Sequence, residues 1–351
     1  MVAQDPKPLI TTIIPTFRRP KLLRRAIRSV LAQTYPHFQV CVYDNASGDE
    51  TASLVEEFAR ADPRVQYHCQ PENVGAFQNF VYGAERIETP FFSFLSDDDL
   101  LLPNFFQTAI EGFEKHPEAV FSATATIQMD ERGTILGVPI LQWEPGFYRP
   151  PAGLQAILKH GHPEWTGIVF RREVWDEVGG LDEAVGPPGD LDFEMRIAAH
   201  FPIVVSTLPG AIFVLHPSSV SGSRQFDLTW PSWSKLIVNI TRDEGIPIEI
   251  RRYAEEVLTR NIKRRLFVFH GLGSIAIRRP EEARRAAQVL REHFRCHGRA
   301  ALLDAMAKLA ETLPATLWVL ACLKRLRWRI FRIMNRGAQH KFGQIARHLE
   351  L

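Results

Sequence analysis

The chain has 351 residues, of which 45% are hydrophobic and 23% are charged. These shares exclude a disordered or collagen-like chain, and the length predicts one large α/β domain with an accessory region, or two domains. A formal charge of +2 excludes a nucleic-acid binder that relies on bulk charge. Four cysteines without metal-type spacing favour a reducing compartment, and no stretch of about 20 apolar residues predicts a membrane span, so we expect a cytoplasmic protein.

The first 215 residues alternate short apolar runs with amphipathic stretches, which is the pattern of a mostly parallel sheet with helices between its strands. Strands are predicted over 9–14, 39–43, 65–69, 91–95, 119–128, 167–170, 203–205 and 211–215. Helices are predicted over 20–33, 50–60, a stretch ending near 87, 104–116, 171–178 and 190–199. The Gly- and Pro-rich stretch 130–151 is interpreted as loops and irregular strands.

The composition changes after a Ser-rich stretch at 218–223. From about residue 231 onward the chain is rich in helix formers and Arg, without a convincing strand. We therefore predict a catalytic or binding domain over 1–223 and a helical C-terminal accessory region over 224–351.

Three adjacent carboxylates, Asp97, Asp98 and Asp99, follow the apolar strand predicted over 91–95. Open parallel sheets bind ligands at the carboxyl ends of their strands. Neighbouring carboxylates repel one another unless positive charge offsets the repulsion, and Mg²⁺ or Mn²⁺ is commonly held by one or two carboxylates together with nucleotide phosphates. We therefore predict a divalent cation and a diphosphate here. The alternative is that the three residues cap the helix beginning near Pro103.

A second acidic group lies at a predicted helix start, where Asp190, Asp192 and Glu194 follow the Gly- and Pro-rich stretch 186–189. Asp190 and Glu194 are four residues apart and share one helix face, with Asp192 turned away. The helix dipole favours the ionised carboxylate, so a general base here needs burial or a neighbouring acid to raise its pKa. The alternative for Asp190 is a helix N-cap alone.

Two other strand ends give weaker signals. The turn after the first strand contains Pro15, Thr16, Phe17 and Arg18, and its backbone amides would face an aromatic base or a phosphate. Asp44 ends the second strand, where an Asx-turn is an equal alternative to ligand contact.

His216 ends the last predicted strand of the first domain. Its neutral imidazole would complete a metal shell begun by Asp99. A lone His at a strand end is more often a plain hydrogen-bonding residue, and this alternative stays open.

Together these pieces resemble the inverting family 2 glycosyltransferases of the GT-A fold over roughly residues 8–222. The motifs follow the family's order and are 14–19 (IPTFRR), 29–35 (SVLAQTY), 42–49 (VYDNASGD), 73–75 (NVG), 96–99 (SDDD) and 179–182 (GGLD). The resemblance implies an α/β fold with a Rossmann-like, mixed but mostly parallel sheet flanked by helices, here followed by the helical C-terminal region.

The resemblance also implies the residues around a nucleotide-sugar donor. Asp97 would lie beside its ribose and diphosphate, and Asp99 would bind Mn²⁺ or Mg²⁺ with Asp97 and His216. The other residues implied on the donor side are Pro15, Thr16, Phe17, Arg18, Asp44, Asn73 and Asp98.

The acceptor side follows from the same resemblance. The family's base usually lies in a Glu-Asp pair, which here reads Gly189-Asp190, so Asp190 is implied as the base and Asp192 as the fallback. Trp165 and Thr166 would meet the acceptor, with the Trp165 ring against a sugar face.

The C-terminal stretch 317–332 interleaves apolar and basic residues. A basic amphipathic helix of this kind is typical of helices that lie on anionic lipid, and packing onto a helical core is an equal alternative. Peripheral contact with the inner membrane face therefore stays open beside the cytoplasmic location.

These features predict an inverting, metal-dependent glycosyltransferase. It would move a sugar from a nucleoside-diphosphate-sugar donor, with a UDP-sugar favoured, to a hydroxyl of a glycan, lipid-linked or small-molecule acceptor in cell-surface polysaccharide or glycoconjugate synthesis. One alternative is a nucleotidyltransferase, but residues 15–19 lack the glycines of a phosphate loop. Another is a catalytically degenerate scaffold, against which the retained Asp97, Asp99, Asp190 and His216 argue.

Overall fold

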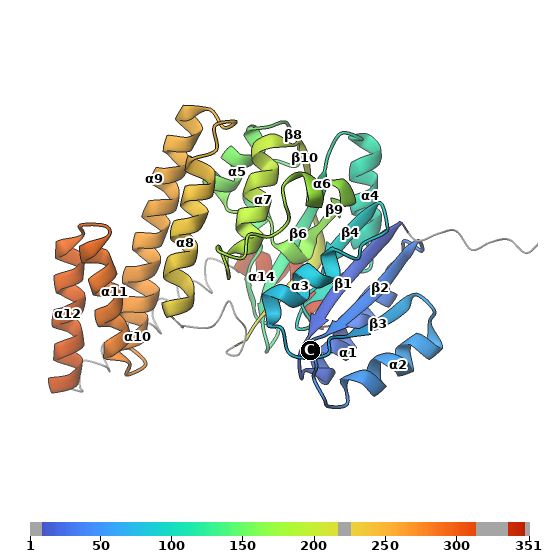
Figure 1. The fold of residues 1–351 in the computed structure, drawn as a ribbon, viewed down its shortest axis with the longest axis horizontal. Helices are drawn as coiled ribbons and strands as arrows, with labels where there is room; N and C mark the ends of the chain where they lie inside the picture. Colours follow the sequence, from blue (N-terminus) through green and yellow to red (C-terminus); the bar gives the residue numbers. More distant parts are fainter. Residues whose placement is uncertain (1–8, 217–225, 314–335, 348–351) are drawn as a thin grey trace, which may run out of the picture. The chain divides into compact units, whose positions relative to one another are not determined.

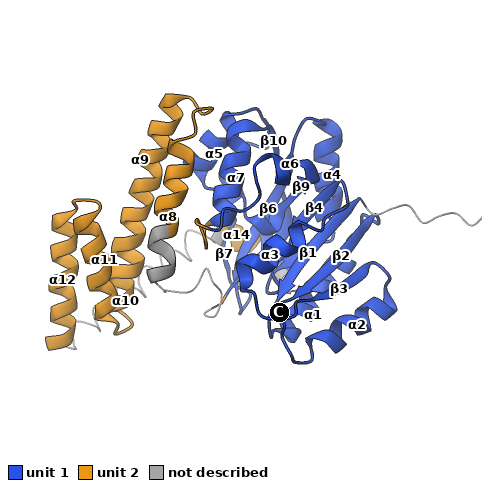
Figure 2. Cartoon of the chain, viewed as in Figure 1, with its two compact units in different colours: residues 1–183, 189–215, 341–351 blue, residues 184–188, 216–340 orange. Residues whose placement is uncertain are grey.

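The computed structural model describes residues 9–216, 226–313 and 336–347 (Figure 1). The chain forms two compact units, coloured separately in Figure 2. Unit 1 contains the described residues within 1–183, 189–215 and 341–351, and unit 2 contains those within 184–188 and 216–340. The division differs from the boundary predicted after residue 223, because 341–351 belong with unit 1.

Unit 1 is built on one mixed sheet. Its strands are β1 (Ile10–Thr16), β2 (Phe38–Asp44), β3 (Val65–Cys69), β4 (Phe91–Phe94), β5 (Leu100–Leu101), β6 (Phe121–Asp130), β7 (Ile135–Gly137), β8 (Gly146–Tyr148), β9 (Ile168–Arg171) and β10 (Ile203–Leu215). Their order is β3-β2-β1-β4-β9-β6-β10-β5, with β7 beside β6 and β8 beside β10. The first four strands pair in parallel, whereas β9 is antiparallel to both β4 and β6.

Helices alternate with these strands along the chain, as their amphipathic patterns predict. The helices of unit 1 are α1 (Pro20–Leu31), α2 (Thr51–Ala61), α3 (Ala76–Ala84), α4 (Phe105–Lys115), α5 (Ala152–His160), α6 (Arg172–Glu177) and α7 (Gly189–His200), with 3-10 turns η1 (Pro139–Gln142) and η2 (Trp165–Gly167). In α1, Leu23, Ile27 and Val30 recur at three- and four-residue spacing and are fully buried in the core, which the strands of the sheet complete.

Close packing of α3 against the sheet positions the polar loop that precedes this helix. A Cβ on Gly83 would come within 2.7 Å of Cγ2 of Ile13 on β1 and 2.9 Å of the Tyr43 ring on β2. Glycine therefore lets the helix approach both strands. The loop that ends at Gly75 is held near the carboxyl ends of β1 and β2 as a result.

Two details of the sheet differ from the prediction. The strands predicted over 203–205 and 211–215 form the single strand β10, whose register against β6 shifts on either side of Pro209. The two-residue strand β5 pairs with β10 and is too short to give a sequence pattern. The irregular stretch 130–151 contains β7, η1 and β8.

Unit 2 is helical in its described residues. Its helices are α8 (Phe226–Thr241), α9 (Ile248–Arg265), α10 (Gly273–Ile275), α11 (Pro280–Glu292) and α12 (His297–Thr312), with the π-helical segment η3 (Leu266–Leu272) continuing α9. Leu266, Ile275, Leu290 and Leu303 belong to its own apolar core. A further helix, α14 (Arg336–Arg347), follows near the end of the chain.

The amphipathic stretch 317–332 lies outside the described residues. Within 9–216, 226–313 and 336–347, every helix is too short or too polar to cross a membrane. The lipid-binding prediction for the stretch therefore stays a prediction.

Candidate active site

The acidic loop (residues 96–99) follows the carboxyl end of β4, which lies between β1 and β9 in the middle of the sheet. Its three carboxylates differ in exposure. Asp99 is fully buried, Asp97 is 4% exposed, and 11% of the Asp98 side chain is exposed. The helix-capping alternative is wrong, because α4 begins at Phe105 with Asn104 as its N-cap residue.

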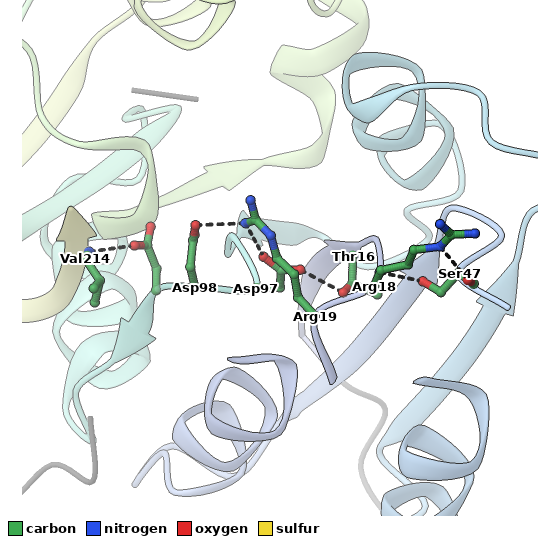
Figure 3. Close-up of polar contacts among 8 residues, drawn as sticks. Thr16, Arg18, Arg19, Ser47, Asp97, Asp98 and Val214 are labelled. Carbon is green, nitrogen blue, oxygen red and sulfur yellow. Dashed lines mark hydrogen bonds and ion pairs between the residues drawn. The ribbon is translucent and has the colours of Figure 1, made fainter. Parts of the chain in front are cut away.

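Asp97 and Asp98 share one cation, the guanidinium of Arg19 (Figure 3). Nη1 of Arg19 lies 3.2 Å from Oδ1 of Asp97 and 3.0 Å from Oδ2 of Asp98, and the hydroxyl of Thr16 donates to Oδ2 of Asp97 at 2.7 Å. Burial, helped by the charge of Asp98, raises the pKa of Asp97 to about 6 against the opposing effects of Thr16 and Arg19. This part of the loop therefore holds negative charge arranged around a positive group.

Asp99 points into the protein and joins three segments. Its Oδ1 accepts the backbone N–H of Val214 on β10 at 2.9 Å, and its Oδ2 accepts the hydroxyl of Thr166 in η2 at 2.6 Å. Burial raises the pKa of Asp99 well above its ordinary value, and the charges of Asp98 and Glu164 act in the same direction. Asp99 thus joins β10 and η2 as a buried clamp, and its predicted role as a metal ligand stays a prediction.

The divalent cation predicted at the acidic loop stays a prediction. In the part of the chain that the structure describes, no three His, Cys, Asp or Glu side chains form a ready-made metal site. The guanidinium between Asp97 and Asp98 nevertheless occupies a position where two carboxylates attract positive charge. His216 is buried directly after β10, and its predicted pairing with Asp99 stays a prediction.

Arg18 turns away from the acidic loop toward the end of β2 (Figure 3). Its backbone N–H donates to Oγ of Ser47 at 2.9 Å and its Nε donates to the Ser47 carbonyl at 3.0 Å. Asp44 accepts the Ser47 N–H at 3.0 Å and hydroxyl at 2.5 Å on one oxygen and the Tyr67 hydroxyl at 2.7 Å on the other. Asp44 therefore shapes the turn after β2, as its Asx-turn alternative predicts, and its contact with a donor stays a prediction.

The loop before α3 completes this edge of the sheet. Asn45 donates through Nδ2 to Oδ1 of Asn73 at 2.9 Å, and its own Oδ1 accepts the N–H of Val74 at 2.8 Å. Asn73 is exposed, as is the ring of Phe17, which is 37% exposed. Both side chains are therefore accessible, although Oδ1 of Asn73 also accepts the N–H of Gly75, and Pro15 and Thr16 are buried in β1.

The acids of α7 face different surroundings. Asp190 is partly exposed in the first turn and accepts the N–H of the next residue, Leu191, at 2.7 Å, whereas an N-cap side chain accepts an N–H two or three residues further on. Asp192 is fully buried and accepts Nε of Arg196 at 2.7 Å in an ion pair. The guanidinium of Arg196 also bonds two backbone carbonyls. Asp192 thus supports the helix internally, and the choice of Asp190 over Asp192 as the base stays a prediction.

A buried ion pair lies on the same face of α7 as Asp190, and the sequence analysis did not predict it. Nδ1 of His162 lies 3.2 Å from Oε2 of Glu194, which is fully buried. Burial by itself would lower the pKa of His162, but the charges of Glu194, Glu164 and Asp190 raise it to about 10. Burial raises the pKa of Glu194 to about 8 against the opposing charge of His162. The available signal was the four-residue spacing of Asp190 and Glu194.

Trp165 and Thr166 are buried side chains, and their predicted contact with the acceptor stays a prediction. Trp165 is 9% exposed and stacks on Phe94 of β4 with ring centroids 4.1 Å apart and an interplanar angle of 26°. Phe80 contacts the same ring edge-on. Because one ring face is covered by Phe94 and the Thr166 hydroxyl is bound to Asp99, both residues belong to the packing that supports the site.

The segment 162–167 connects the two acidic groups of unit 1. Thr166 bonds Asp99 of the acidic loop, and the charge of Glu164 raises the pKa of Asp99. Burial raises the pKa of Glu164 itself, and the charge of Asp190 adds to that rise. His162 of the same segment bonds Glu194 of α7, one helical turn after Asp190, so residues 162–167 contact both the acidic loop and α7.

Likeness to solved structures identifies the fold. TarS of S. aureus, residues 1–349 in complex with UDP-GlcNAc, aligns with a TM-score of 0.63 and 16% identity over 86% of this chain and 91% of that chain. A mannosyltransferase of Pyrobaculum calidifontis in complex with GDP-Man and Mn²⁺ aligns with a TM-score of 0.50 and 18% identity over 91% and 87% of the two chains. Together with the sheet order, these likenesses define a GT-A fold.

The family follows from the sequence. Residues 11–179 match the family model described as Glycosyl transferase family 2, and over this stretch the chain belongs to that family. The fold and family implied by the sequence motifs are therefore confirmed.

Curated relatives share part of their length with this chain. The O-antigen biosynthesis protein RfbC of Myxococcus xanthus is 30% identical over 221 residues, which are 57% of this chain and 17% of the relative. A GalNAc(5)-diNAcBac-PP-undecaprenol beta-1,3-glucosyltransferase of Campylobacter jejuni is 33% identical over 105 residues, which are 30% of this chain and 34% of the relative. The chain thus spans less than two thirds of the length of these relatives.

Proposed function

We propose that the protein transfers a sugar from a nucleoside-diphosphate-sugar donor to an acceptor hydroxyl, with inversion at the anomeric carbon. The observation that supports this proposal is that the segment 162–167 bonds both the acidic loop, through Thr166, and α7, through His162. Relatives named for O-antigen biosynthesis and for glucosyl transfer to a lipid-linked glycan favour polysaccharide or glycoconjugate synthesis as the setting.

On the donor side, Asp97 and Asp98 would hold the diphosphate through Mn²⁺ or Mg²⁺. When bound, such a cation supplies Lewis-acid stabilisation of the charge that grows on the leaving diphosphate. Thr16 fixes the orientation of Asp97 by its hydrogen bond. The guanidinium of Arg19 would turn from the carboxylates to a phosphate oxygen, a partner that suits its planar donors.

The nucleoside would lie along the edge formed by β1, β2 and the loop before α3. Phe17 and Asn73 are the exposed side chains on this edge, and Asp44 holds the turn between them through Ser47 and Tyr67. A UDP-sugar is the favoured donor, in line with the UDP-GlcNAc complex of the structurally similar TarS.

On the acceptor side, Asp190 would take the proton of the acceptor hydroxyl. The hydroxyl oxygen forms its bond to the anomeric carbon while the bond from that carbon to the diphosphate oxygen breaks on the opposite face. Attack from the opposite face inverts the configuration. Asp190 suits this role because it is partly exposed, whereas Asp192 and Glu194 are buried in ion pairs.

The proposal is tested by incubating the protein with a panel of UDP-, GDP- and dTDP-sugars and Mn²⁺. We expect slow hydrolysis of one donor class, with water replacing the acceptor, and a first-formed sugar of inverted anomeric configuration when NMR spectra are recorded before mutarotation. Release of the retained anomer would contradict inversion. A protein that binds nucleotide and hydrolyses no donor would be a scaffold.

A further inference from the structure

The His162–Glu194 pair has the geometry of an anchored charge. Glu194 is fully buried in α7, and its Oε2 lies 3.2 Å from Nδ1 of His162. Its other oxygen, Oε1, accepts no hydrogen bond from the described residues. The hydrogen bond to Glu194 and the nearby acidic side chains favour the charged form of the ring and raise the pKa of His162, so the imidazole is held as an imidazolium.

Asp190 and Glu164 complete a group of four ionisable side chains. Asp190 lies four residues before Glu194 on the same face of α7, and Glu164 follows His162 by two residues in the segment before η2. Glu164 is oriented by Gln128 of β6, whose Nε2 donates to Oε1 of Glu164 at 2.5 Å. The group therefore contains three acids and one base, and the charged groups that face His162 are Glu194, Glu164 and Asp190.

Charges this close alter the proton affinity of their neighbours in opposite directions. A positive His162 makes it easier for a nearby carboxyl to stay ionised, and a negative Glu164 or Glu194 makes it harder. The first turn of α7 adds the positive end of the helix dipole, which also favours the ionised form. A base at this position therefore depends on the balance between His162 and Glu164 for the pH range in which it works.

We propose that His162 is a positioning residue whose positive charge, anchored by Glu194, sets the pH range over which Asp190 accepts the proton of the acceptor hydroxyl, with Glu164 acting in the opposite direction. This inference rests on the proposed function of Asp190. It gives a role to a histidine and a glutamate outside every family motif in the chain.

The test is the pH profile of kcat/KM for donor hydrolysis or transfer. His162→Gln removes the positive charge and should move the acidic limb to higher pH, on the order of one pH unit. Glu164→Gln removes a negative charge and should move the same limb to lower pH. His160→Gln, two residues from His162 at the end of α5, is the matched control and should leave the profile in place.

Several outcomes overturn the inference. If the acidic limb of the pH profile is unchanged in both variants, or moves in the same direction in both, the His162–Glu194 pair is purely structural. Loss of activity in Glu164→Gln as large as that in Asp190→Asn would make Glu164 the base. A wild-type protein without Asp190-dependent transfer would contradict the proposed function first, and so is distinguishable from an unmoved profile.

A second measurement needs no activity. In protein labelled at histidine Cε1, one of the 12 histidines should keep its proton well above pH 7, and that NMR signal should be missing from His162→Gln. A His162 signal that titrates near its ordinary pKa of 6.5 would contradict the anchored charge. Because Glu164 lies outside the ion pair, Glu164→Gln tests the inference even where His162→Gln does not fold.

Discussion

The two acidic groups of unit 1 are balanced by different cations. Asp97 and Asp98 share Arg19, whose guanidinium stays charged at every accessible pH, whereas Glu194 and its neighbours share His162, whose imidazole can lose its proton. The proposed donor side therefore contains a permanent charge and the proposed acceptor side an ionisable one. This difference matches the proposed roles, since binding a diphosphate needs constant charge and taking a proton needs a base of suitable pKa.

The largest effect on activity is expected from a substitution of the proposed base, Asp190. Asp190→Asn removes the proposed base without changing the acidic loop, so turnover should fall by about 10² to 10⁴. Donor binding, measured by calorimetry with UDP-sugar and Mn²⁺, should stay close to wild type. Asp176→Asn, an exposed carboxylate on α6, is the control. Normal turnover in Asp190→Asn would show that Asp190 is not the base.

The donor side should respond in binding. Asp98→Asn leaves the fold intact but weakens the carboxylate pair, so Mn²⁺-dependent binding of UDP should fall by at least about tenfold. Binding measured without Mn²⁺ should change less, since Arg19 remains. The opposite result would be a folded Asp99→Asn variant whose UDP binding no longer depends on Mn²⁺, together with an Asp98→Asn variant whose binding still does. Asp99 would then be the metal ligand, as the sequence analysis predicted.

The link between the two sides should be visible in stability. Thr166→Val removes the hydroxyl that donates to the fully buried Asp99, so the free energy of unfolding should fall by about 1 to 3 kcal/mol. The exposed hydroxyl of Thr34, which donates to a backbone carbonyl, is the matched control, and Thr34→Val should change stability by less than about 0.5 kcal/mol. An equal loss of unfolding free energy in both variants would show that the bond between Thr166 and Asp99 contributes no special stability.

The smallest effect is expected in the pH dependence of stability, which reports on the charge of His162. The folded-state pKa of His162, about 10, lies above its ordinary 6.5, so its stabilisation is fully present below pH 6.5 and is lost as the pH rises through 10. The pKa of Glu194, raised to about 8 from 4.5, makes stability decline over pH 4.5 to 8. Urea unfolding should therefore show a decline from pH 6.5 to 10 that is weaker in the double variant H162Q/E194Q. An unchanged slope would contradict both shifts.

Local patterns predicted the parts of the site that lie on continuous stretches of chain. The apolar run 91–95 followed by three carboxylates indicated a binding loop at a strand end, and β1 to β4 place it there. The helix containing Asp190 was predicted within a residue or two for the same reason. The alternation of apolar and polar residues is a local pattern, and its period indicates directly whether a stretch forms a strand or a helix.

Other roles depended on which way a side chain turns. Three adjacent aspartates look alike in the sequence, yet Asp99 is buried against Val214 and Thr166 while Asp98 meets Arg19. Trp165 was predicted on a sugar face, and its ring stacks on Phe94. The orientation of these side chains depends on contacts between segments that are tens of residues apart. The spacing of residues along the chain does not predict such contacts.

By itself, the order of residues determined the alternation of strands and helices, the family, and the position of the acidic loop, because each depends on neighbours within a few residues. Only the tertiary structure decided that His162 is paired with Glu194, 32 residues away, and that Arg19 bridges Asp97 and Asp98. Burial and charge pairing are properties of side chains brought together in space. They set the ionisation of the site, which is why its working groups became visible only after folding.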